Sequence, residues 1–128
     1  MAVPSIEILN GIWRLDFTYQ VAAARPPLEL LVMIQNGVMA GLANAGVIAT
    51  GDFSFRPNGA VEFQIFFDMT FADSSIQLIS RGGKAVREQV QFAGVLSFDS
   101  KMRMMEGFFD HGVVPIMTRG VFVAPIPL

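Results

Sequence analysis

The chain has 128 residues, of which 16 % are charged, and it carries a net charge of −2 with its basic residues scattered. This balance excludes an extended basic surface for nucleic acid. The absence of cysteine excludes disulfides, thiolate metal sites and a cysteine nucleophile. The mean hydropathy of +0.50 requires apolar surface to be hidden in a large interior, a subunit interface, a ligand cavity or a membrane.

Apolar and polar residues alternate almost without a break between Asn10 and Val21. Side chains of a strand point alternately to its two faces, so this pattern predicts a strand over 11–21 with one buried face. The apolar side consists of Trp13, Leu15, Phe17, Tyr19 and Val21.

A stretch without any charged residue runs from Leu30 to Gly51, which is about the length of a spanning helix. Asn36 and Gly37 interrupt it, and this pair between apolar runs is a strong signal for a hairpin turn. We therefore predict two strands joined by a tight turn, and no membrane span.

Similar alternation and turn residues predict strands along the remaining chain, with no sustained helical period. The expected strands cover 11–21, 28–35, 38–42, 47–55, 60–71, 75–80, 87–98, 102–109 and 116–124. Consecutive short strands joined by tight turns favour an all-β, single antiparallel up-and-down barrel of eight or nine strands, because closure removes the exposed edges.

The whole chain, 1–128, is expected to form one domain, with residues 1–10 as a lead-in and residues 125–128 as a proline-containing tail. The first residues show neither a basic segment nor an apolar run typical of a signal peptide. We therefore expect a cytoplasmic location.

Gly11 and Trp13 on the first strand, together with Arg119 on the last, resemble the signature of the lipocalin and calycin superfamily. The resemblance implies a barrel in which Trp13 closes one end and Arg119 packs across the indole, while Gly11 allows close backbone approach. A guanidinium over an indole face would gain cation–π attraction.

A second resemblance covers the first half of the chain. The runs 36–41 and 50–53 are similar to the hairpin, bend and glycine–aromatic rhythm of the small lipocalin-like barrels of the type III secretion negative regulator family. That resemblance again implies a small lipocalin-like barrel.

Polar candidates for chemistry are few. We interpret His111 as a solvated turn residue, and without a second histidine or any cysteine we expect no metal site. Glu106 and Asp110 could perform acid–base chemistry if one were desolvated, with Asp68 nearby only if the strand order allows. We predict no catalytic residue and no cofactor.

Whether the barrel interior is hollow or filled distinguishes a ligand-binding protein from a protein that acts through its outer surface. Phenylalanines facing inward either clasp a hydrophobic small molecule or fill the barrel, and methionines at 102, 104 and 105 either adapt to a ligand or pack as core. Our first interpretation is a hydrophobic ligand held by inward residues. These are Tyr19, Phe63, Ile65, Phe67, Met69, Phe92, Met104 and Phe108.

The alternative is a filled barrel that acts through its outer surface. The strand at 28–34 is apolar on both faces, and its outward Leu31 and Met33 would mark a partner surface. Phe66 and Phe109 are expected to break the polar faces of their strands in the same way. We predict a two-fold homodimer. A cofactor-free isomerase or cyclase is the third hypothesis.

Overall fold

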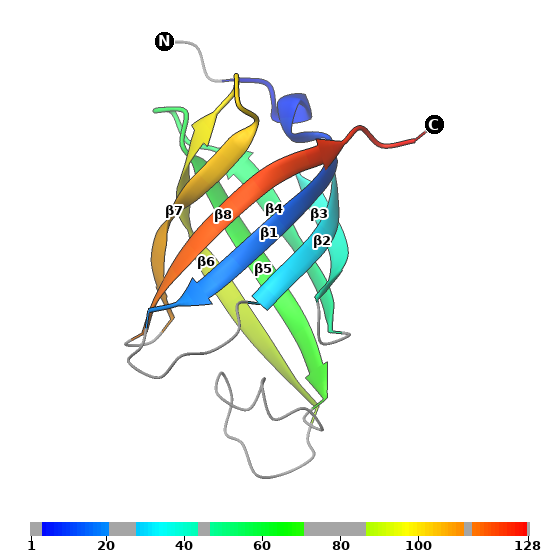
Figure 1. Cartoon of the computed structure of the whole chain (residues 1–128), viewed down its shortest axis with the longest axis vertical. Coiled ribbons are helices and arrows are strands. Elements are labelled where there is room, and N and C mark those ends of the chain that lie inside the picture. Colours follow the sequence, from blue (N-terminus) through cyan, green and yellow to red (C-terminus); the bar gives the residue numbers. More distant parts are fainter. Residues whose placement is uncertain (1–3, 21–27, 44–46, 71–86, 112–113, 128) are drawn as a thin grey trace.

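The computed structural model describes residues 4–20, 28–43, 47–70, 87–111 and 114–127, excluding the side chains of 68–70 and 87–89. Within these residues, a short 3₁₀ helix precedes eight strands, which form one closed antiparallel barrel in chain order (Figure 1). The elements are η1 (Ile6–Leu9), β1 (Gly11–Tyr19), β2 (Leu28–Gln35), β3 (Val38–Ala43), β4 (Ile48–Phe55), β5 (Val61–Thr70), β6 (Arg87–Asp99), β7 (Met104–His111) and β8 (Val114–Ala124). This architecture confirms the predicted fold class.

The predicted hairpin at the centre of the uncharged stretch is confirmed. β2 and β3 pair from Leu30↔Ala43 to Gln35↔Val38, and the turn residues Asn36 and Gly37 have φ values of 51° and 83°. Both values lie in the left-handed region that asparagine and glycine tolerate best. The predicted strand at 75–80 lies outside the described residues.

The core fills the barrel because alternate side chains of every strand point inward. Along β2, for example, Leu30, Val32 and Ile34 are buried while Leu31 and Met33 are exposed. The two-sided apolar character predicted for this strand is therefore confirmed.

One end of the barrel is closed by η1. Leu9 is fully buried, and its carbonyl oxygen accepts a hydrogen bond of 2.8 Å from Nε1 of Trp13. The side chain of Asn10 accepts a bond of 2.8 Å from the backbone N–H of Asn36, which ties the chain beside η1 to the β2–β3 hairpin. No helix in the described part of the chain is both long and apolar enough to cross a membrane.

Candidate functional site: a filled interior and an apolar outer face

Phenylalanine rings from opposite walls meet inside the barrel. β1 and β5 are four strands apart in the closed order, yet the rings of Phe17 and Phe67 lie 6.2 Å apart between centroids. Phe92 contacts both rings, at 5.3 Å from Phe17 and 4.9 Å from Phe67. Phe109 joins Phe92 at 5.1 Å and Phe63 at 5.4 Å. At this level, side chains occupy the full width of the barrel.

The inward prediction holds for part of the proposed ligand set. Phe63, Ile65, Phe67 and Phe92 are at most 1 % exposed. Tyr19 is half-buried and packs against this core. The side chain of Met69 lies outside the described residues.

The prediction for β7 is wrong by one position. Phe108 is 65 % exposed and Met104 is only half-buried, whereas Met105 and Phe109 are buried. Two adjacent apolar pairs in this strand allow either its odd-numbered or its even-numbered residues to face the interior. Pairing with β8 turns the odd-numbered residues inward and places Phe109 opposite Ile116. It is therefore Phe108, and not Phe109, that lies on the outer face beside polar neighbours.

His111 belongs to β7 and is not a turn residue. Its ring is half-buried and lies edge-on to Phe92, with centroids 5.0 Å apart. The preceding carboxylates Glu106 and Asp110 are both exposed on the outer face of β7. Asp68 is on β5, which β6 separates from β7 in the strand order, and the side chain of Asp68 is not described. Among the described residues, no group of three acidic or histidine side chains is placed to hold a metal ion.

The closure of the Trp13 end also differs from expectation. Trp13 is fully buried, but Arg119 is exposed on the outer face, in register with Asp16 and Glu106. Inward positions on β8 have even numbers, so Arg119 points away from the indole. Phe122 takes its place, edge-on to Trp13 at 5.7 Å.

Arg103, in the turn before β7, lies over the ring of Phe122, with its guanidinium carbon 4.4 Å from the ring centroid. A methyl group on Gly11 would collide with the Phe122 ring, so glycine leaves room for that ring at the start of β1. The sequence-based prediction missed Arg103 and Phe122 because it assigned the cationic role to the arginine within the last strand.

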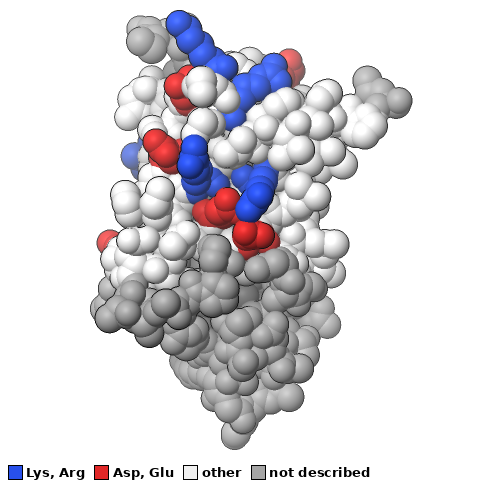
Figure 2. All heavy atoms as spheres, in the orientation of Figure 1, with Lys and Arg blue, Asp and Glu red and all other residues white. Residues whose placement is uncertain are grey.

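Charged side chains gather on the outer face formed by β7, β8, β1 and β2. In the strand register, Glu106, Arg119, Asp16 and Glu29 are consecutive neighbours. Figure 2 shows red and blue side chains close together on this side of the molecule. Positive and negative charges are interspersed here, so the face presents no field of a single sign.

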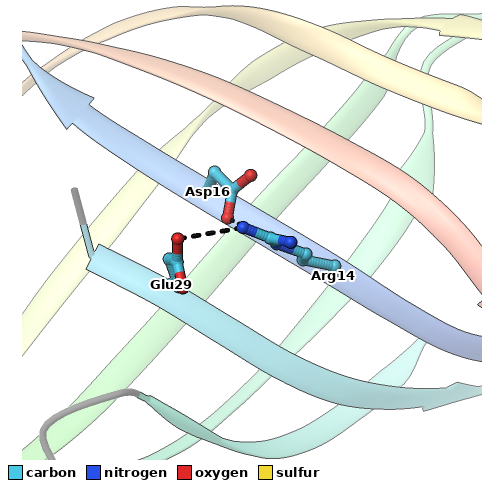
Figure 3. A network of polar contacts seen from close by, with 3 residues as sticks. All are labelled: Arg14, Asp16 and Glu29. Atoms are coloured by element: carbon cyan, nitrogen blue, oxygen red, sulfur yellow. Dashed lines mark hydrogen bonds and ion pairs between the residues drawn. The ribbon is translucent and has the colours of Figure 1, made fainter.

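Arg14 forms the best defined polar contacts of this face (Figure 3). Its Nε donates to Asp16 at 3.2 Å, and its Nη2 donates to Glu29 at 2.9 Å. The hydrogen bond and charge of Asp16, followed by the charge of Glu29, raise the pKa of Arg14 above its ordinary value. The positive charge of Arg14 is thus compensated within its own chain.

An apolar surface lies next to these ions, over β2, β3 and β4. We call it the apolar face, and its large side chains are Leu31 (58 % exposed), Met33 (43 %), Val38 (64 %), Leu42 (58 %) and Ile48 (55 %). Leu31 is the cross-strand neighbour of Leu42, which in turn is the neighbour of Ile48. The predicted partner surface on β2 therefore continues over two further strands.

Two hollows formed by described residues open on the outside of the barrel. One, of about 320 Å³, adjoins the apolar face and is lined by Arg14, Glu29, Leu30, Leu31, Leu42 and Ala43. The other, of about 510 Å³, lies at the β6–β7 hairpin and is lined by Ser97, Phe98, Asp99, Ser100, Lys101, Met104 and Glu106.

Comparison with known proteins does not add a relative to this picture. No protein-family model matches the chain, and neither a curated protein nor a solved structure matches it.

Proposed function

We propose that this protein is a protein-interaction barrel that works as a homodimer through the apolar face. The observation that carries the proposal is the row formed by Leu31, Leu42 and Ile48, three large apolar side chains that are each more than half exposed on adjacent strands. Contiguous apolar surface of this kind is typical of a partner site.

The size of the face is compatible with a specific interface. Its five large side chains expose on the order of 500 Å² in each copy, so two copies approach the roughly 1,000 Å² that a biological interface needs. Arg14 and Glu29 place charged side chains along the β1–β2 edge of the face, and polar groups at an edge are typical of the rim of known interfaces. In Figure 2 the surface beside the charged group, over β2, is white.

A charged side chain introduced into the apolar face tests the proposal. Leu42→Asp should convert a dimer into a monomer in sedimentation equilibrium at micromolar concentration, because a buried carboxylate without a partner opposes association. Phe108→Asp is the matched control, since Phe108 is similarly exposed but lies on β7. A wild-type protein that sediments as a monomer at tens of micromolar would refute the proposal.

Binding of a hydrophobic small molecule inside the barrel stays a prediction, as does kinship with the calycin barrels. The contact between Phe17 and Phe67 across the barrel favours the filled-core alternative. Native mass spectrometry of the purified protein separates the two functions in one measurement. A dimer at the mass of two bare chains supports the interaction barrel, whereas a copurified small molecule bound to each chain supports the carrier.

A further inference from the structure

The apolar face consists of three cross-strand rows that differ in polarity. Each row takes one residue from β2, one from β3 and one from β4. The rows are Leu31–Leu42–Ile48, Met33–Ala40–Thr50 and Gln35–Val38–Asp52. The first row is entirely apolar, and the third includes a carboxylate, so the face has an apolar end and a more polar end.

A two-fold dimer can bring two such faces together in two simple ways, because its axis must lie in the plane of the interface. With the axis along β3, each row meets the same row of the partner, and the entirely apolar rows cover each other. With the axis across β3 at Ala40, the first row meets the third, which places Asp52 against the partner's Ile48. A carboxylate pressed against apolar surface loses hydration without gaining a partner.

From these rows we infer that the second copy docks with the two-fold axis running along β3, an inference that rests on the proposed homodimer. This arrangement places β2 of one protomer opposite β4 of its partner. The partner's Ile48 then projects toward the hollow of about 320 Å³ beside Leu31 and Leu42. The relation is reciprocal, so each copy supplies one projecting side chain and one hollow.

The ions at the edge of this row also favour a second copy over a charged partner. Arg14 follows Leu31 in the register on the β1 side of this row, and Asp68 follows Ile48 on the β5 side. Asp16 and Glu29 already bind the guanidinium of Arg14 at 3.2 Å and 2.9 Å. A docking protein therefore needs no acidic group at this point, and an identical apolar row is complementary to the face.

Single-cysteine variants test the axis cleanly because the chain contains no cysteine. Facing sheets lie about 10 Å apart, so a short bifunctional maleimide is the suitable crosslinker. Leu42→Cys should give at least five times more covalent dimer than the control Phe108→Cys. An equimolar mixture of Leu31→Cys and Ile48→Cys should crosslink several times more than either variant alone.

The alternative axis has a different signature. If it holds, Leu42→Cys alone gives no more product than the control, while a mixture of Val38→Cys and Leu42→Cys crosslinks efficiently. That result would overturn the inferred axis and leave the homodimer intact, provided that sedimentation of the untreated variants still shows a dimer. Sedimentation of the wild-type protein as a monomer would instead refute the homodimer itself and the axis with it.

Discussion

The indole of Trp13 meets the ring of Phe122 edge to face, with the two centroids 5.7 Å apart. This contact joins the first strand to the last at the closed end of the barrel, and the guanidinium of Arg103 lies over the Phe122 ring. The aromatic ring of Phe122 thus does what the sequence led us to expect of Arg119, whose side chain lies on the outer surface.

The first prediction separates these two residues. Phe122→Ala should lower the free energy of unfolding by about 2–4 kcal/mol, because it removes a half-buried ring that packs against the core. Arg119→Ala should change it by less than about 0.5 kcal/mol, as is usual for an exposed position. Urea denaturation followed by the fluorescence of Trp13, the only tryptophan, measures both. Equal losses in the two variants would contradict the described closure.

The second prediction tests the phase of β7 with two adjacent phenylalanines. Phe109 is 7 % exposed and lies in the aromatic cluster, whereas Phe108 is 65 % exposed. Phe109→Ala should cost about 3–5 kcal/mol of stability, and Phe108→Ala less than about 1 kcal/mol. Chemical denaturation of the two variants checks this, and a reversed order would show that the strand is turned the other way.

The third prediction concerns the tight wall between β4 and β5. A methyl group on Gly51 would collide with the backbone carbonyl oxygen of Gln64, which cannot rotate away as a flexible side chain could. Gly51→Ala should therefore destabilise the protein by at least about 2 kcal/mol. Gly59→Ala serves as the control, since open space surrounds it and its φ of +86° alone costs about 1–2 kcal/mol. Thermal unfolding of both variants gives the comparison, and a harmless Gly51→Ala would argue against the described pairing.

The fourth prediction concerns the forces that hold the proposed dimer. Apolar side chains dominate the face. The dissociation constant of the dimer should therefore change less than threefold when sodium chloride rises from about 0.1 M to about 1 M, although the Debye length falls from about 10 Å to about 3 Å. Sulfate should tighten the dimer, since it strengthens the burial of apolar surface. Sedimentation at each salt concentration measures this. Dissociation in high salt would assign the interface to the charged strands instead.

Sequence patterns predicted this fold well where local turn residues mark the ends of a strand. β2 begins and ends where predicted, and its turn at Asn36 and Gly37 has the expected backbone geometry. Turn chemistry and alternation are local properties, so they can be read without knowledge of neighbouring strands.

The candidate site was harder to predict, because its residues depend on pairing between strands. In β7, the pairs Met104–Met105 and Phe108–Phe109 allow either phase, although Glu106 and Asp110 share the parity of Phe108 and indicated the outward side. The apolar face was predicted only on β2. Leu42 and Ile48 join it through a cross-strand register that no single segment specifies.

The hydrogen bond from Trp13 to the carbonyl oxygen of Leu9 restricts how far η1 can move away from the end of the barrel. It lies in a dry environment, so η1 could swing aside only if a buried donor and acceptor lost each other without water to replace them. We therefore expect η1 to keep the Trp13 end of the barrel closed, so that this end does not serve as an entrance to the interior.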